Sequence, residues 1–337
     1  MIETVELAPD YRVSRIVRGG WQLHAAATPD IEAEAAKALR FVEAGVTAFE
    51  TSDTYRHVDA ALALALDRRR AAGLPLPRVH ARLTLPCDVS VGRAAIAARL
   101  GLPTLDLVQL QSWALDEDAL AGAALRLREE AAAGRLRHFG LMNIGEDTLE
   151  RLLRRGVRPL TLQAQLSLLD RRALPRLAEA ARAEGVSLLA YGTLAGGFLH
   201  ERWLGRPDPG ARPTAATPFH AEYRAVIEAF GGWGLYQELL AALASVAARH
   251  GARVATVATR WALDQPNVAA ALVGSSDPAR AREWADIFAL RLDDADRARL
   301  DAVLARSEGP TGQVGGLERD GESPLARAIA ASRASVA

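Results

Sequence analysis

Short apolar segments alternate with longer segments of helical periodicity along most of the chain. The apolar segments are nearly continuous, which is typical of strands buried on both faces of a parallel sheet. We predict eight strands, in the segments 15–21, 46–50, 78–83, 105–110, 136–142, 159–165, 186–192 and 268–274. The helical segments are 30–44, 58–72, 88–100, 117–133, 146–155, 174–184, 234–250, 254–264 and 278–289.

This unbroken alternation predicts an α/β protein with an all-parallel sheet. Eight strand-helix units in this length favour a closed (β/α)8 TIM barrel over a doubly wound sheet. We expect one barrel domain over residues 1–304 and a C-terminal tail over 305–337, either packed on the barrel or extending from it. The segment 199–233 is rich in Pro and Gly and follows the seventh strand, so it predicts a long loop over the barrel mouth.

Composition excludes several classes of partner. The 337 residues include 41 basic and 41 acidic side chains, so a formal charge of zero gives no reason to expect a nucleic-acid partner. No apolar run reaches the roughly 18 residues of a membrane span. Cys87 is the only cysteine, the seven histidines lack metal-ligand spacing, and the start resembles no signal peptide, so we expect a cytoplasmic protein with no metal. The oligomeric state stays open.

Candidate chemistry follows from the barrel, because barrel enzymes carry it on the loops after the strands. The stretch "FETSDTYRH" follows the second strand and has two interpretations. In one, Ser52, Asp53 or Thr54 caps a helix that begins near His57, and Tyr55 is a half-buried aromatic. In the other, this strand end carries a catalytic site.

Five motifs near the strands favour the second interpretation and leave the first open. They are "GGWQL" after the first strand, "GRLRHFGLMN" at the fifth, "QLSLLDRR" after the sixth, "AYGTLAGGFL" after the seventh and "VATRWALDQP" before the eighth. Together they resemble the aldo-keto reductases over roughly residues 13–305. The resemblance implies an oxidoreductase in which a small carbonyl receives hydride from NADPH and a Tyr donates the proton, assisted by an Asp, a Lys and a His.

Three of these four catalytic positions are altered. The Tyr falls on Tyr55, but the Asp falls on Glu50, the Lys on Arg82 and the His on Gln111. Arg82 keeps the positive charge of the Lys but carries it on a planar guanidinium group. Gln111 cannot take up or release a proton near neutral pH, as the His can. Glu50 and Arg82 are suited to a bidentate ion pair, which would leave the phenol of Tyr55 less acidified.

The resemblance also implies a site for the nicotinamide half of the cofactor. Asn143 and Gln163 would bind the carboxamide and Tyr191 would stack on the ring, while Met142 stands where a Ser or Thr is common. The glycine-rich loop after the seventh strand can bring main-chain N–H groups to a pyrophosphate. Its cofactor-binding candidates are Gly192, Leu194 and Gly196.

The adenosine half would lie after the eighth strand. Ser275 and Arg280 match family positions that meet a 2′-phosphate, and Glu283 is placed for the adenine amine, so NADP(H) is the expected cofactor. Trp284 replaces an Asn that is usual in the family. It either stacks on the adenine or fills its pocket.

Aromatic and imidazole side chains provide the expected substrate site. The candidates are Trp21, His24, His57 and Trp113. His24 and His57 end adjacent strands, so they either supply the acid or base that Gln111 cannot, or are ordinary histidines of the rim.

Three functions are compatible with these residues. The first is an NADP(H)-dependent aldo-keto reductase-like oxidoreductase acting on a small carbonyl or alcohol. The second is a catalytically impaired nicotinamide-binding protein or partner-binding barrel. The third is elimination or isomerisation without redox change, with Glu50 or a rim histidine as base. We favour the first, because all three altered positions carry polar side chains that can meet a substrate.

Overall fold

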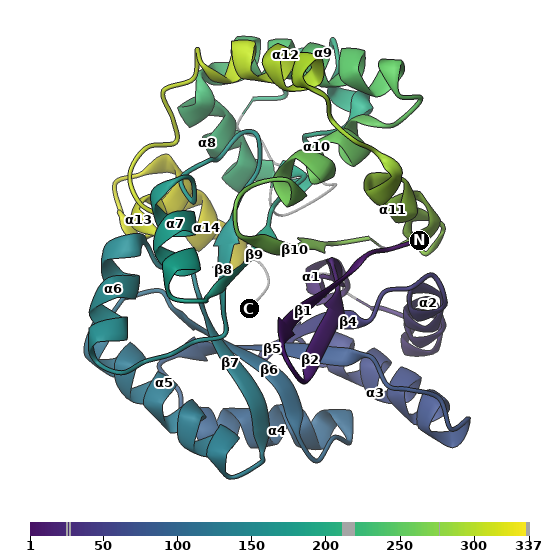
Figure 1. The fold of residues 1–337 in the computed structure, drawn as a ribbon, viewed down its shortest axis with the longest axis vertical. Coiled ribbons are helices and arrows are strands. Elements are labelled where there is room, and N and C mark those ends of the chain that lie inside the picture. The colour runs from purple at the N-terminus through teal and green to yellow at the C-terminus, as the bar shows by residue number, and fades with distance from the viewer. Residues whose placement is uncertain (25, 27, 211–219, 276, 335–337) are drawn as a thin grey trace.

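The eight predicted strands form a closed parallel barrel (Figure 1). The structure, a computed structural model, describes residues 1–337 except 25, 27, 211–219, 276 and 335–337. Around the barrel the strand order is β10-β3-β4-β5-β6-β7-β8-β9. The strands are β3 (Ile16–Arg18), β4 (Ala48–Ser52), β5 (Arg78–Leu85), β6 (Leu105–Ser112), β7 (Leu136–Met142), β8 (Thr161–Gln165), β9 (Ser187–Tyr191) and β10 (Val268–Val273). The predicted (β/α)8 fold is confirmed.

Helices surround the barrel where the helical periodicity predicts them. Asp30, Asp88 and Asp116 begin three of them, since each carboxylate accepts a main-chain N–H of the first turn. The helices are α2 (Ile31–Glu43), α3 (Arg56–Ala71), α4 (Val89–Leu100), α5 (Glu117–Ala132), α6 (Glu146–Arg154), α7 (Arg176–Ala183), α9 (Gly232–Arg249), α10 (Val254–Leu263) and α11 (Ala279–Ala289). None of the helices in the described part of the chain could span a bilayer.

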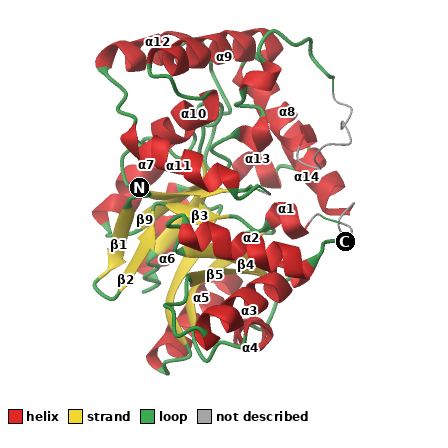
Figure 2. Cartoon of the chain, turned by 90° about the vertical axis from the view of Figure 1, so that its right-hand side faces the viewer, coloured by secondary structure: helices red, strands yellow, loops and turns green. Residues whose placement is uncertain are grey.

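An N-terminal hairpin closes one end of the barrel, and the sequence pattern does not predict it. Strands β1 (Thr4–Ala8) and β2 (Tyr11–Ser14) pair antiparallel. Figure 2 shows them at one end of the barrel. Tyr11 and Val13 pack with Leu107 and Leu189 from the barrel interior, so this end is filled with apolar side chains. A site therefore has to lie at the opposite end, where the strands terminate.

Additional helices gather at that opposite end (Figure 2). They are α1 (Trp21–His24), α8 (His220–Phe230), α13 (Gly316–Arg319) and α14 (Pro324–Ala334). The predicted loop 199–233 contains the 3-10 turn η2 (Glu201–Trp203) and helix α8, and a second 3-10 turn, η1 (Ala195–Gly197), precedes it. Its residues 211–219 lie outside the described part. Helix α12 (Asp294–Leu304) packs on α9, and α14 packs on α8.

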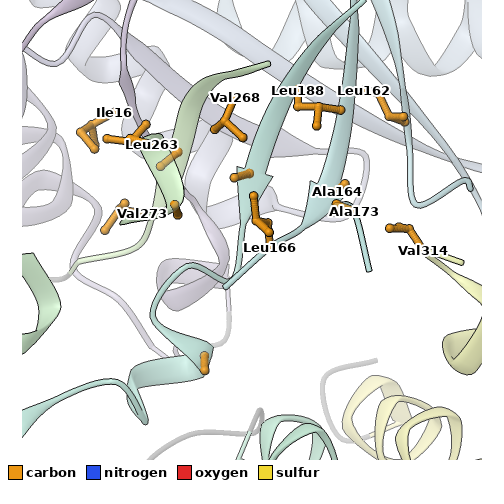
Figure 3. Close-up of a cluster of buried hydrophobic side chains, with 14 of the residues drawn as sticks. Ile16, Leu162, Ala164, Leu166, Ala173, Leu188, Leu263, Val268, Val273 and Val314 are labelled. Carbon is orange, nitrogen blue, oxygen red and sulfur yellow. The ribbon is translucent and has the colours of Figure 1, made fainter. Parts of the chain in front are cut away.

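The main hydrophobic core lies between the barrel wall and the surrounding helices. Leu162 of β8, Leu188 of β9 and Val268 of β10 contribute buried side chains to it. Val314, which precedes α13, belongs to the same cluster and is shown in it in Figure 3. The tail is thus joined to the barrel by apolar packing as well as by polar contacts.

Polar side chains fill the middle of the barrel. Gln109 donates from Nε2 to Oγ1 of Thr161 at 2.8 Å. Gly140 lies on β7, between Gln109 on β6 and Thr161 on β8, and a side chain at Gly140 would collide with both residues. His80 is buried, and neither of its ring nitrogens has a hydrogen-bond partner among the described residues. Burial lowers the pKa of His80 to about 3, because the charged imidazolium cannot be solvated there.

We expect His80 to make the protein less stable as the pH falls. The unfolded chain protonates this imidazole near its ordinary pKa of 6.5, whereas the folded protein keeps it neutral down to about pH 3. The free energy of unfolding should therefore fall by about 2 kcal/mol from this residue between pH 6.5 and about pH 4.5. Urea unfolding of His80→Leu should lack this contribution. The half-exposed His57, replaced by Leu, is the matched control, and equal pH profiles for wild type and His80→Leu would contradict the prediction.

Candidate active site at the carboxyl end of the barrel

The centre of the site is a hydrogen bond between Tyr55 and Arg82. Tyr55 directly precedes α3 and its side chain is buried, with 1% of the residue exposed. Arg82 of β5 donates from Nη2 to Oη of Tyr55 at 3.0 Å, and its guanidinium carbon lies 5.0 Å from the centre of the phenol ring. Two adjacent strands, β4 and β5, lead to this pair. A cation is therefore held against the phenol oxygen.

The capping interpretation of residues 52–54 is wrong. Helix α3 begins at Arg56, and no side chain caps it. Ser52 instead donates to Asp53 at 2.6 Å, and Asp53 accepts the main-chain N–H of Thr84 at 2.9 Å. These bonds join the loop that carries Tyr55 to strand β5 and so fix the phenol beside Arg82.

Glu50 is held by an amide, and the expected ion pair with Arg82 is not formed. Gln163 donates from Nε2 to Oε1 of Glu50 at 3.0 Å, with both side chains buried. The strand register explains why Glu50 and Arg82 do not form the predicted ion pair. Glu50 lies opposite His80, whereas Arg82 lies opposite Ser52 and is one layer nearer the mouth. Arg82 consequently meets the phenol rather than the carboxylate.

The phenol of Tyr55 holds its proton at neutral pH. Burial raises its pKa well above the ordinary value of 10, because the phenolate would lose its hydration. The charge of Arg82 opposes this shift and that of Glu50 adds to it. The site therefore presents a protonated Tyr beside a fixed cation.

Aromatic rings line one side of Tyr55. The His24 imidazole stacks on the phenol, with ring centres 4.5 Å apart, and Trp21 meets it edge-on at 5.8 Å. Burial lowers the pKa of His24, and the charges of Arg82 and His57 lower it further, so this imidazole is neutral at pH 7. Trp21 and His24, which we predict to contact substrate, thus lie beside Tyr55.

The other predicted substrate-side residues lie at neighbouring strand ends. Gln111 is buried near the end of β6, and Trp113 follows that strand and is half-buried. His57 is half-buried in the first turn of α3.

Three predicted nicotinamide residues come together on adjacent strands. Tyr191 of β9 donates from its hydroxyl to Oδ1 of Asn143 at 2.8 Å. Asn143 follows β7 and donates its main-chain N–H to the carbonyl of Gln163 on β8 at 3.0 Å. Its φ of 54° places it in the left-handed region, which non-glycine residues seldom adopt. Met142, one residue earlier, is buried.

The glycine-rich loop after β9 packs against helix α8. Gly192 and Gly196 have φ of 70° and 61°. A Cβ on Gly192 would lie 2.6 Å from the Tyr223 hydroxyl, and one on Gly196 would collide with its ring. Leu194, between them, is half-buried. The two glycines are therefore required for the close approach of Tyr223, whatever ligand the loop also meets.

Two arginines share one carboxylate at the predicted adenosine end. Glu283 accepts from Arg280 at 3.3 Å and from Arg253 at 2.8 Å. Glu201 also pairs with Arg253 at 3.8 Å, so two guanidinium groups face two carboxylates here. The guanidinium groups offer N–H donors of the kind that bind a phosphate. Ser275 donates to the carbonyl of Asp277 at 3.0 Å in the preceding loop.

Sequence reasoning missed Arg253. It precedes α10 at the N-cap position but provides no cap, because Glu201 accepts the N–H of Val254 at 2.7 Å instead. An Arg at a position where Ser, Thr, Asp or Asn is preferred was the available signal.

Trp284 belongs to the core of the protein. Only 6% of the residue is exposed, and its ring stacks on Phe41 of α2 with centres 5.2 Å apart. The guanidinium of Arg18 lies 4.8 Å from the centre of the same Phe41 ring. Trp284 therefore joins α11 to α2, and its burial fits a side chain that fills the adenine pocket better than one that stacks on an adenine.

The residues present suit a nicotinamide dinucleotide. Asn143 and Gln163 offer amide donors and acceptors next to the flat ring of Tyr191, as a carboxamide and its ring require. Arg280 and Arg253 offer guanidinium donors where a phosphate would lie. Among the residues that the structure describes, no His, Cys, Asp and Glu cluster could hold a metal ion.

A closed (β/α)8 barrel with a buried Tyr–Arg pair and an amide-lined strand end belongs to the class of barrels that carry their polar site at the carboxyl ends of the strands. A sequence profile of the aldo/keto reductase family matches residues 93–305. The chain belongs to the aldo/keto reductase family.

Individual relatives are distant. The chain is 31% identical over 183 residues to protein tas of Escherichia coli, covering 52% of this chain and 50% of that protein. It is 31% identical over 182 residues to flagellar radial spoke protein 5 of Chlamydomonas reinhardtii, covering 49% and 34%. An NADH-specific methylglyoxal reductase of Escherichia coli is 26% identical over 206 residues, covering 60% of each chain. The chain thus spans between a third and three fifths of the length of these curated relatives.

The fold has a close match among solved structures. A glycerol dehydrogenase from Gluconobacter oxydans matches with a TM-score of 0.76 over 92% of this chain and 99% of that one. The sequence identity is 22%, so this similarity concerns the fold.

Proposed function

We propose that the protein is an NADP(H)-dependent oxidoreductase that reduces a small carbonyl compound at the open end of the barrel. The observation that carries this proposal is the bond from Arg82 to the buried hydroxyl of Tyr55. It is supported by the adjacent residues Asn143, Gln163 and Tyr191, which suit a nicotinamide.

Each side chain has a distinct task in this proposal. A bound NADPH would supply the hydride. Tyr55 donates the proton of Oη to the carbonyl oxygen, and Arg82 stabilises the phenolate that remains. Gln111 donates a hydrogen bond that orients the carbonyl, and Glu50 keeps the amide of Gln163 in place.

The raised pKa of Tyr55 keeps a proton on Oη throughout the neutral range, because burial makes the phenolate costly. Reduction of a carbonyl needs this protonated form as the donor, whereas oxidation of an alcohol needs the phenolate as base.

The preference for NADPH rests on the adenosine end. One relative is an NADH-specific reductase, so family membership leaves the choice open. The guanidinium donors of Arg280 and Arg253, which share the carboxylate of Glu283, support a 2′-phosphate.

We expect Arg280→Ala to weaken NADPH binding by about 10- to 100-fold and NADH binding by less than about threefold. A hydrogen bond to a charged group contributes about 1.5–3 kcal/mol, and only NADPH has the 2′-phosphate. Quenching of tryptophan fluorescence measures both affinities. Arg299, exposed on α12, provides the control Arg299→Ala. An equal loss for the two cofactors would contradict a 2′-phosphate contact.

The proposed function is tested by cofactor titration followed by a panel of aldehydes and ketones. Binding of NADPH with turnover of any carbonyl supports it. Binding without turnover across the panel would support the second function, a nicotinamide-binding barrel. Conversion of substrate without any nicotinamide would support elimination or isomerisation.

A further inference from the structure

The C-terminal tail docks on the loop that carries Asn143. Gln313 donates from Nε2 to the carboxylate of Asp147, and its side chain fills the space beside Gly145, where a Cβ would collide with it. The next residue, Val314, is buried in the core cluster shown in Figure 3. This segment of the tail is therefore packed against the β7–α6 connection by both polar and apolar contacts.

Arg319 of α13 joins the ends of two barrel strands. Its Nη2 donates to the main-chain carbonyl of Ser112 at 3.1 Å and to that of Asn143, while Nη1 donates to the carbonyl of Gly315 at 2.8 Å. Gly315 has φ of 80°, and a Cβ on it would collide with the carbonyl of Asn143. The tail thus reaches the same carbonyl oxygen twice, by a guanidinium and by a close main-chain approach.

Asn143 has a left-handed backbone conformation, which Asn tolerates, and three contacts hold it in this conformation. Its N–H is fixed by Gln163 and its side chain by Tyr191, both from the barrel. Its carbonyl is fixed by Arg319, from the tail. Two of the three restraints therefore come from the barrel and the third from α13.

The guanidinium of Arg319 holds main-chain carbonyl groups in place. No carboxylate lies within ion-pair distance of it among the described residues, and its neighbour Glu318 is paired with Arg172 instead. Its assigned hydrogen bonds all go to main-chain carbonyls. A side chain committed in this way positions the backbone that it contacts.

We propose that Arg319 is a positioning residue of the nicotinamide site, and that the tail completes this site by holding Asn143 in its left-handed conformation. The inference rests on the proposed function. It implies that a barrel of residues 1–304 has the Tyr55–Arg82 pair but an incompletely fixed carboxamide site.

The test compares two ligands on the full chain. NADPH reaches both ends of the cofactor site, whereas adenosine 2′,5′-bisphosphate reaches only the adenosine end. We expect Arg319→Ala to raise the Kd for NADPH about tenfold and to leave that for the bisphosphate within about twofold. Arg319→Lys should recover part of the NADPH affinity, since an ammonium also donates to carbonyls. Arg327→Ala is the matched control, because Arg327 is an exposed arginine of α14.

Gly315→Ala provides a second test should Arg319→Ala fold poorly. Its Cβ would displace the same carbonyl of Asn143, so the same difference between NADPH and the bisphosphate is expected. Unchanged NADPH affinity in Arg319→Ala would overturn the proposal, and so would an equal loss for both ligands, which indicates general damage. Failure of the wild type to bind NADPH would instead remove the proposed function, and this inference with it.

Discussion

Tyr55→Phe is expected to lower kcat for carbonyl reduction by about 10²- to 10⁴-fold and to leave the NADPH Kd within about twofold. The substitution removes only Oη, which donates the proton and accepts the hydrogen bond of Arg82. The ring still packs between His24 and Arg82, so the shape of the site is kept. Steady-state oxidation of NADPH gives kcat, and fluorescence titration gives the Kd.

Tyr236→Phe is the matched control for this change. Tyr236 of α9 is also buried, and its hydroxyl donates to the carbonyl of Phe198 at 2.7 Å in a different part of the molecule. This variant should lose about 1 kcal/mol of stability and keep its kcat. Full turnover by Tyr55→Phe would show that the proton comes from another group, for which His24 is the nearest candidate.

The barrel is predictable from sequence because its strands are continuous apolar runs, whereas the hairpin β1–β2 is not. Thr4, Glu6 and Arg12 of that hairpin face away from the barrel, so each strand offers only a short alternating pattern. Its buried residues, among them Tyr11, are buried against the end of the barrel. Their burial therefore cannot be predicted before the barrel itself is known.

The candidate site also has one part that the sequence predicts and another part that it does not. The resemblance to the family places Tyr55 and Arg82 at neighbouring strand ends, and their contact follows from the fold. The ion pair expected for Glu50 depends on strand register, which one sequence does not reveal. The role of Arg319 depends on a contact to Asn143, 176 residues earlier in the chain.

The tail is held by a buried ion triad, and breaking it is expected to have the largest effect on stability. Arg172 pairs with Asp170 at 2.7 Å and with Glu318 of α13 at 2.6 Å. The three side chains are 1%, 0% and 3% exposed, respectively. Arg172→Met should lower the free energy of unfolding by about 3–5 kcal/mol, because it leaves two carboxylates buried without a cation. Urea unfolding at neutral pH measures this change.

A surface pair provides the control and shows why burial matters. Arg297 pairs with Asp264 at 3.2 Å but is 42% exposed, so Arg297→Met should cost less than about 1 kcal/mol. A comparably small cost for Arg172→Met would mean that water or protons reach the two carboxylates.

If the triad mainly fixes the tail, proteolysis after residue 304 should accelerate at urea concentrations where the barrel is still folded, since Glu318 is the member that links α13 to the barrel. Simultaneous loss of tail and barrel would instead make the tail part of one cooperative unit, and a carboxamide site that depends on Arg319 would then be as stable as the barrel itself.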